Sequence, residues 1–247
     1  PGEMPDRFGL AALSAQAVAA RTYALAGMRT RTWLHADVRS QVYAGRDGET
    51  WLGDRAVEAT RGQVLTAAGR VFPAWFHSTC GGATVPARTM FPTAPQSVLR
   101  ESRPCEDCVS SPTWSWTRRL SAGVVCDAAG LPRAPLEAVQ GVPDRWPGRP
   151  TTVRVRAGGQ SAEVSAEQFR RDVSASQAFE RRLLSTRWGA PAALDGGELV
   201  IQGHGWGHGV GLCQYGAAGR ARRGDGYAEI LAHYYDGAVL VQLDDPT

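Results

Sequence analysis

The chain of 247 residues is 43% hydrophobic and carries 27 basic against 24 acidic side chains, a formal net charge of +3. This composition excludes a disordered or fibrous chain. The small net charge does not indicate binding to nucleic acid or to a charged membrane surface. No stretch approaches the ~20 apolar residues of a membrane span, so we expect a single globular domain over residues 1–247, built of one or two lobes.

The first expected element is a helix over residues 10–28. This segment is rich in alanine and places apolar residues at three- and four-residue steps, which is typical of a helix with a narrow apolar stripe. Pro5 and Gly9 hold the preceding residues out of that helix. Glu3 therefore lies on the loop that leads into the helix, near the positive end of the helix dipole.

Shorter elements follow as far as His77. Residues 51–61 predict a small helix. Residues 63–66 and 71–76 predict two strands joined by a turn at Gly69, so a hairpin is expected to end at His77.

The remainder of the chain predicts further strands and helices. From their periodicity we expect strands at 114–120, 152–157 and 198–201, and helices at 131–139, 166–172 and 226–235. The fold class is therefore α+β, with mainly antiparallel strands, a long N-terminal helix and a substrate groove between two lobes.

Four side chains in the middle of the chain have the spacing of a zinc site. His77 and Cys80 form one short knuckle and Cys105 and Cys108 form another, which together make a tetrahedral set of one imidazole and three thiols. Residues 77–112 otherwise have little periodicity, so this long loop needs some support other than secondary structure. A structural zinc ion would stabilise it. The alternative is a buried histidine with a disulfide from Cys80 to one cysteine of the second knuckle.

The five cysteines make complete internal pairing impossible. Cys126 and Cys213 fall outside the proposed zinc set. We expect both to be plain buried thiols.

A glycine-rich segment near the C-terminus, residues 203–211, carries two histidines four residues apart, His204 and His208. Five glycines in nine residues make a helix there improbable, which weakens a helical metal pair. The spacing favours a loop whose backbone approaches a ligand closely and presents imidazoles and amides to it. A tight, glycine-lined strand crossing with one buried histidine is the alternative.

Several motifs, in order along nearly the whole chain, resemble the sporulation stage II protein D family, which includes the LytB amidase-enhancer proteins. The motifs are Glu3-Met4-Pro5, LAALSAQAVAARTYAL, FHSTCGGAT, RRLLSTRW, GHGWGHGVGLCQYGAAGRA and ILAHYYDG. The resemblance implies an exported, envelope-located lytic transglycosylase that acts on peptidoglycan glycan strands, with Glu3 as the catalytic residue. It also implies that His208, Gln214 and Tyr215 lie along the glycan groove.

Two further positions are compared with the family pattern. Arg21 matches a family position and could hold a muramic carboxylate, although a salt bridge at the surface or between lobes is the alternative. Ser14 stands where the family shows a basic residue. The role of that basic residue is therefore either absent from this chain or carried by another position.

The implied chemistry needs only one carboxyl group. A lytic transglycosylase uses the C6 hydroxyl of its substrate as nucleophile, so Glu3 would protonate the glycosidic oxygen and then accept the hydroxyl proton as a 1,6-anhydro ring closes. One rival is a glycan-binding module without catalysis that stimulates a cell-wall amidase. Another rival is a metal-dependent hydrolase built on His204 and His208.

Overall fold

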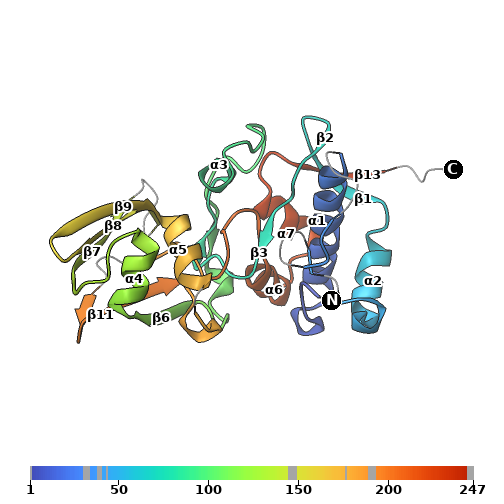
Figure 1. Ribbon diagram of the computed structural model, residues 1–247. Coiled ribbons are helices and arrows are strands. Elements are labelled where there is room, and N and C mark those ends of the chain that lie inside the picture. The colour runs from blue at the N-terminus through green and yellow to red at the C-terminus, as the bar shows by residue number, and fades with distance from the viewer. Residues whose placement is uncertain are drawn as a thin grey trace. The chain divides into compact units, whose positions relative to one another are not determined.

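The computed structural model describes residues 2–29, 34–37, 41–42, 44–143, 149–175, 177–188 and 193–243. The chain forms two compact units, one made of Pro1–Ser111 with Gly209–Thr247 and the other of Pro112–His208. Short helices and small, mainly antiparallel sheets make up both units (Figure 1), which confirms the α+β class. None of the helices among the described residues combines the length and apolar character that crossing a bilayer requires.

The discontinuous unit is built around one long helix, α1, with the bounds predicted from the sequence. Helix α1 spans Leu10–Met28. The other elements of this unit are shorter: η1 (Asp6–Phe8), η2 (Arg46–Gly48), α2 (Trp51–Ala59), β1 (Gln63–Ala67), β2 (Arg70–Val71), β3 (Phe76–His77), β4 (Gly82–Ala83), α3 (Ala87–Met90), β5 (Pro104–Cys105), η3 (Glu106–Cys108), β12 (Leu212–Cys213), α6 (Gln214–Arg222), α7 (Tyr227–Tyr234) and β13 (Val239–Gln242).

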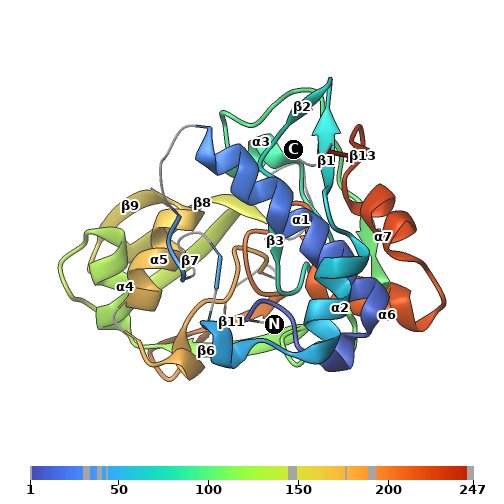
Figure 2. The same cartoon turned by 90° about the vertical axis from the view of Figure 1, so that its right-hand side faces the viewer.

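Small side chains allow α1 to be buried on several sides. Ala12, Ala15 and Ala19 are fully buried, and alanine loses no side-chain entropy in a helix. Helices α2, α6 and α7 all pack on α1, and Figure 2 shows α2 and α6 beside its N-terminal half. The helix begins after Gly9, whose φ of 88° suits a residue without a Cβ.

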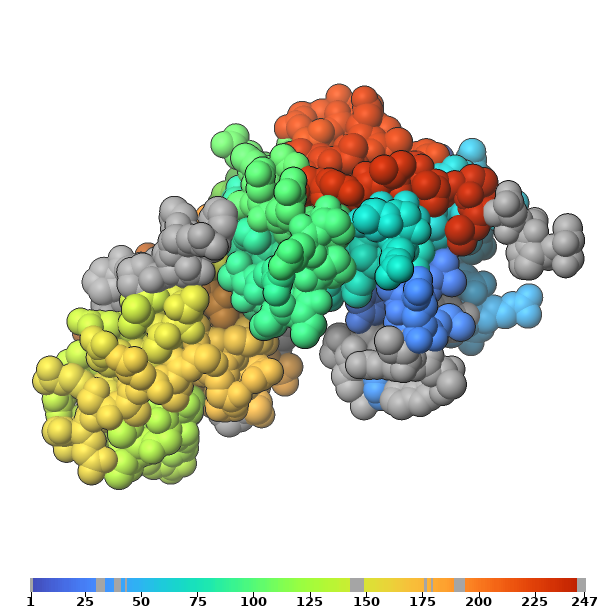
Figure 3. Space-filling view, turned by 90° about the horizontal axis from the view of Figure 1, so that it is seen from above, coloured from blue at the N-terminus to red at the C-terminus, as the bar shows by residue number. Residues whose placement is uncertain are grey.

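Strand β1 forms the centre of an antiparallel sheet in the order β13-β1-β2. Val64 pairs with Val241 and Leu65 with Leu240, so the end of the chain lies beside a strand from its first third. In Figure 3 the red C-terminal residues accordingly lie against the cyan residues of this region.

The expected hairpin is only partly correct. Strands β1 and β2 do pair antiparallel, but β2 ends at Val71, and residues 72–75 belong to no strand. Pro73 has no N–H to give to a ladder, which ends the strand. Phe76 and His77 then pair in parallel with Leu212 and Cys213 instead of continuing the hairpin.

The continuous unit contains two three-stranded antiparallel sheets, in the orders β10-β11-β6 and β7-β8-β9. Its elements are β6 (Ser115–Leu120), α4 (Ala122–Ala129), β7 (Leu136–Pro143), β8 (Pro150–Ala157), β9 (Gln160–Ser165), α5 (Ala166–Ala175), η4 (Phe179–Arg181), β10 (Ala193–Asp195) and β11 (Glu198–His204). Helices α4 and α5 pack on each other and on β8, around a core that includes Val153, Val155 and Phe169.

The helix expected at residues 131–139 is wrong. The structure has α4 at Ala122–Ala129, and residues 136–143 form β7. Ser121 caps α4 by accepting a hydrogen bond from the Val124 N–H, and Gly130 ends it in the left-handed conformation with a φ of 68°. These two cap residues are the local signals that mark the true helix.

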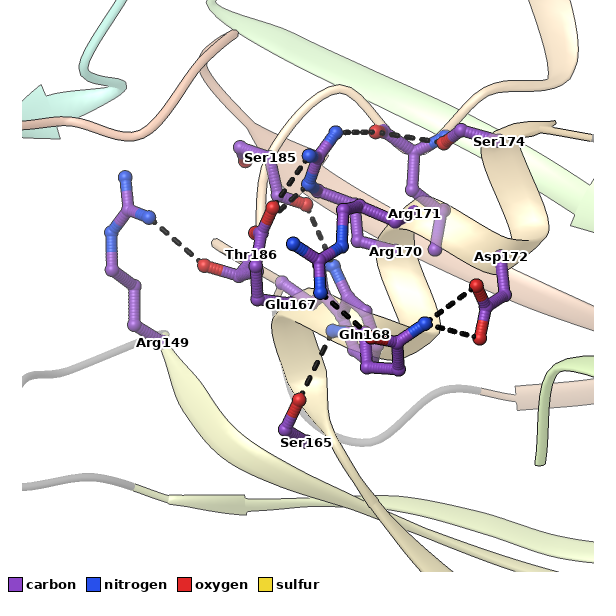
Figure 4. A network of polar contacts seen from close by, with 12 residues as sticks. Arg149, Ser165, Glu167, Gln168, Arg170, Arg171, Asp172, Ser174, Ser185 and Thr186 are labelled. Atoms are coloured by element: carbon purple, nitrogen blue, oxygen red, sulfur yellow. Dashed lines mark hydrogen bonds and ion pairs between the residues drawn. The ribbon is translucent and has the colours of Figure 1, made fainter. Parts of the chain in front are cut away.

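Figure 4 shows a network of polar contacts in the continuous unit. Arg149 is buried and donates to the Thr186 hydroxyl at 3.0 Å, while Gln168 on α5 donates to both carboxylate oxygens of Asp172 one turn later. The Arg149 contact links the residue before β8 to the segment that follows η4, and Ser174 Oγ on α5 accepts from the Leu183 N–H of the same segment at 3.2 Å.

Replacing Thr22 with valine tests how α1 is tied to the central sheet. The buried Thr22 hydroxyl donates to the Val18 carbonyl at 2.8 Å and accepts from the Leu65 N–H at 2.9 Å. Valine keeps the shape but leaves that N–H without an acceptor, so we expect Thr22→Val to lower the free energy of unfolding by about 1–3 kcal/mol. Urea denaturation measures this, with the exposed Thr93→Val as control; equal stability of the two variants would contradict the assignment.

Candidate active site and cysteine cluster

Glu3 lies on the loop before η1, as the sequence predicts. Its carboxylate accepts a hydrogen bond from the Val42 N–H at 2.5 Å. Burial raises the pKa of Glu3 above its ordinary value of 4.5, while the hydrogen bonds from Val42 and from the Gln214 side chain act in the opposite direction. The group is therefore a half-buried carboxyl whose protonated form is favoured by its surroundings.

Glu3 lines a cavity of about 560 Å³. Its lining is mainly apolar, and the lining residues of α2 include two carboxylates, Asp54 and Glu58. The lining residues are Gly2, Glu3, Met4, Leu13, Gln16, Ala17, Ala20, Arg21, Gln41, Val42, Glu49, Gly53, Asp54, Ala56, Val57 and Glu58. Glu49, Asp54 and Glu58 are exposed, so Glu3 is the carboxyl group of this lining that is withdrawn from water.

Gln214 connects Glu3 and Gln16 of α1 to helix α6. Gln214, the first residue of α6, hydrogen-bonds Glu3, and its Nε2 also donates to Gln16 Oε1 over 3.4 Å. Both glutamines are buried, with 8% and 6% of their surface exposed. The position of Gln214 on α6 therefore affects the charge state of Glu3.

Arg21 lines the same cavity, but its guanidinium is engaged by the main chain. Nη1 donates to the carbonyl oxygens of Thr60 at 2.8 Å and Gln63 at 2.7 Å, just beyond the C-terminal end of α2. Partial burial lowers the pKa of Arg21 from its ordinary value. These contacts tie α1 to the α2–β1 connection, and contact of Arg21 with a muramic carboxylate stays a prediction.

Tyr215 follows Gln214 and packs on the N-terminal segment. Its ring meets Phe8 edge to face with centroids 4.8 Å apart, and its backbone N–H donates to the Ser78 carbonyl at 3.1 Å. Ser14, where the family shows a basic residue, is buried on α1.

The two histidines of the glycine-rich segment belong to the other unit, which ends at His208. His204 is the last residue of β11, and its Nδ1 lies 3.1 Å from the Trp114 carbonyl oxygen. Within the part of the chain that the structure describes, neither His204 nor His208 belongs to a group of three or more potential metal ligands. The role of His208 in a glycan groove stays a prediction.

Four cysteines from distant segments form a buried cluster. The thiol sulfurs of Cys80, Cys105, Cys108 and Cys213 all lie within 4.8 Å of one another, an arrangement that could hold a metal ion. Among the described residues no other group of this kind occurs. The five cysteines are free thiols, so the alternative of a disulfide from Cys80 is wrong.

Cys213 occupies the place that the sequence analysis assigns to His77. The two residues are direct partners in the parallel β3–β12 pair, but His77 Nδ1 lies 3.1 Å from the Val210 carbonyl oxygen, and His77 is not a member of the cluster. The expectation that Cys213 is a plain buried thiol was therefore wrong. The separation of Cys213 from the knuckles along the chain left no spacing pattern by which to find it.

The donor set fits a tetrahedral zinc ion. Two sulfurs bound at about 2.3 Å to one zinc ion lie about 3.8 Å apart, close to the 3.5 Å between Cys80 Sγ and Cys108 Sγ. Hydrogen bonds from the thiols of Cys105, Cys213 and Cys80 hold the pKa of Cys108 far below its ordinary value, so the cluster favours a thiolate at that position. The Tyr234 hydroxyl lies 3.0 Å from Cys105 Sγ at the edge of the cluster.

The cluster anchors the start of α6. Cys213 Sγ accepts from the Gly216 N–H at 3.4 Å and so caps the helix on which Gln214 and Tyr215 lie. A Cβ on Gly216 would meet the Tyr234 hydroxyl at 2.1 Å and Cys105 Sγ at 2.5 Å. A Cβ on Gly219 would meet the Asp107 carbonyl oxygen at 2.2 Å, so the glycines of α6 permit its close approach to the second knuckle.

Comparison with known proteins gives consistent matches. Residues 1–66 match the family model described as SpoIID, stage II sporulation protein. The chain is 32% identical to an uncharacterized protein of Brachyspira hyodysenteriae, over 99% of this chain and 65% of that protein. It is 29% identical to stage II sporulation protein D of Bacillus amyloliquefaciens, over 98% of this chain and 72% of that protein.

A fourth match is to the amidase enhancer of Bacillus subtilis, at 26% identity over 97% of this chain and 39% of that protein. The chain thus spans just under two thirds of the Brachyspira protein and well under half of the amidase enhancer.

The raised pKa of Glu3 predicts that Glu3→Gln stabilises the fold in a pH-dependent way. Because the folded-state pKa lies above its unfolded value, folding favours the protonated carboxyl, and this stabilisation is lost as the pH rises through the folded-state pKa. Glutamine resembles the protonated form, so the variant should have no stability advantage at low pH and should gain one as the pH rises from about 4 to about 8 through the folded-state pKa of Glu3.

Thermal melting of both proteins across this pH range measures the difference. Glu58→Gln is the matched control, because Glu58 lines the same cavity but is exposed, and Arg61 lowers its pKa. That variant should gain nothing at high pH. An equal gain in both variants would show that general surface charge, not burial of Glu3, is responsible.

Proposed function

The chain belongs to the SpoIID/LytB-like family, and from that premise we propose that it is a lytic transglycosylase that cleaves peptidoglycan glycan strands, with Glu3 as its single acid and base. The observation that carries the proposal is the state of Glu3, which is half-buried in a cavity where the other carboxylates are exposed. Hydrolysis by the usual route needs two carboxyl groups, whereas transglycosylation needs one that acts twice.

In this mechanism the protonated Glu3 gives its proton to the glycosidic oxygen between N-acetylmuramic acid and N-acetylglucosamine. The bond from the muramic C1 to that oxygen breaks, and the leaving sugar departs with a hydroxyl group. The C6 hydroxyl oxygen of the muramic residue then bonds to C1, and the Glu3 carboxylate takes its proton. The product carries a 1,6-anhydro ring, and Glu3 returns to its starting form.

The local contacts support both halves of this role. Burial favours the protonated acid that the first step needs. The N–H donors of Val42 and Gln214 stabilise the carboxylate that the second step needs.

We further propose that the cysteine cluster holds a structural zinc ion through Cys80, Cys105, Cys108 and Cys213. Four protein ligands leave no open position for water, so the ion would stabilise the fold and take no part in bond cleavage. By securing the first turn of α6 it would keep Gln214 in contact with Glu3.

A second candidate function is a non-catalytic, glycan-binding enhancer of a cell-wall amidase. The name of the Bacillus subtilis relative, amidase enhancer, favours it. Both functions place the protein on peptidoglycan in the cell envelope, after export. They differ in whether the protein alone cleaves glycan strands.

Glu3→Gln separates the two candidates. The amide cannot donate and retrieve a proton, so we expect the variant to keep its fold and glycan binding while turnover falls by at least ~10²–10⁴-fold. Mass spectrometry of digested peptidoglycan measures 1,6-anhydro ends, and the exposed Glu163→Gln on β9 is the control. Free reducing muramic ends would point to water as nucleophile, and absence of any cleavage by the unaltered protein would favour the enhancer.

Cys213→Ser tests the zinc ligands. We expect the unaltered protein to contain about one zinc ion per chain, and the variant to lose it and melt about 10 °C lower, because zinc-binding energy is folding energy. Elemental analysis and thermal melting measure these changes. Cys126→Ser, which lies outside the cluster, should keep its zinc. Loss of zinc from His77→Gln but not from Cys213→Ser would restore the ligand set expected from the sequence.

A further inference from the structure

Gln16 presents an unsatisfied hydrogen-bond donor in the candidate active site. It lies on α1, has 6% of its surface exposed and lines the cavity that contains Glu3. Its Nε2 is buried and has no hydrogen-bond partner among the described residues. Buried polar atoms are paired in the great majority of cases, so an orphan of this kind in a cavity lining points to a missing partner.

The neighbouring amide fixes which end of Gln16 is free. Gln214 Nε2 donates to Gln16 Oε1 over 3.4 Å, and the Gln214 side chain lowers the pKa of Glu3, as expected of a donor to that carboxyl group. Turning the Gln16 amide over would bring two N–H groups together and lose this contact. The orientation therefore leaves Nε2 of Gln16, a residue of the cavity lining, without a hydrogen-bond partner among the described residues.

The charges around the cavity limit what that partner can be. Glu3, Glu49, Asp54 and Glu58 line it, and the basic residue among the described lining residues, Arg21, directs its Nη1 to main-chain carbonyls. An anionic acceptor would be repelled by these carboxylates. A neutral oxygen is favoured, and the acetamido carbonyl is the strongest neutral acceptor that an amino sugar offers.

We propose that Gln16 recognises the acetamido carbonyl of a bound sugar and so selects N-acetylated over N-deacetylated glycan. This inference rests on the proposed glycan-cleaving function and adds a specificity residue to it. A buried donor discriminates strongly, because a ligand that lacks the acceptor leaves the donor unpaired in the complex. A hydrogen bond to the acetamido group involves none of the atoms that react, so the expected effect of Gln16 is on binding and selectivity.

The test is a double-mutant cycle between residue 16 and the acetyl groups of the ligand. Calorimetry measures the Kd of the β-1,4-linked N-acetylglucosamine tetramer and of its fully deacetylated form, for the unaltered protein and for Gln16→Met. We expect Gln16→Met to weaken binding of the acetylated tetramer by about 5- to 100-fold and to leave the deacetylated tetramer nearly unchanged. The Gln16→Met variant should therefore lose most of the preference for the acetylated tetramer.

Gln41→Met is the matched control. Gln41 lines the same cavity, but its Nε2 already donates to the Ala20 carbonyl at 2.9 Å, so its loss should leave the preference for acetylated ligand in place. If Gln16→Met does not fold, Gln16→Glu serves instead, because its carboxylate can still accept from Gln214 while the donor is gone. An unchanged preference in either Gln16 variant overturns the inference.

The proposed function and this inference fail in different ways. If the unaltered protein binds neither tetramer and releases no anhydro ends from peptidoglycan, both are overturned. If it releases anhydro ends and the Gln16 variant keeps the full preference for acetylated tetramer, only the role of Gln16 is overturned.

Discussion

The convergence of four thiols is the constraint on which the rest of the candidate site depends. Cys80, the knuckle at Cys105 and Cys108, and Cys213 come from three separate stretches of chain, and the strand pairs β4–β5 and β3–β12 bring them together. Cys213 is also the cap of α6, so the cluster sets where that helix begins. The first residues of α6 then contact Glu3 and Phe8, which means that packing around the sulfurs determines the surroundings of a carboxyl group on the N-terminal loop.

Local signals in the sequence were sufficient where a segment's structure is decided by its own residues. Helix α1 has the predicted bounds because an alanine-rich stretch with small buried faces is helical in nearly any packing, and β8 and α5 carry clear alternation and periodicity. The segment 131–139 failed because its apolar residues suit a strand as well as a short helix, and pairing of β7 with β8 decided the outcome.

The remaining errors arose from contacts between distant parts of the chain. Helix α6 was missed because glycine weakens a helix, and only the approach to η3 explains why Gly216 and Gly219 are tolerated there. Cys213 was misassigned for the same reason, since its three partners are brought close by strand pairing alone. Glu3 could be singled out only by resemblance to a family, because burial and the Val42 hydrogen bond have no signature in a single sequence.

The division of the chain has a consequence for the order in which the protein acquires its site during synthesis. The unit that holds Glu3 is interrupted by the whole of the other unit, and Gln16 and Gln214 meet across 198 residues. The interrupting unit, a continuous stretch, can fold as soon as it emerges, whereas the Glu3 unit must wait for β12, α6 and β13. A nascent or truncated chain that ends before residue 212 therefore has the glutamate but lacks Gln214 and the rest of α6, so the surroundings that tune the carboxyl group are completed only once these residues have been made.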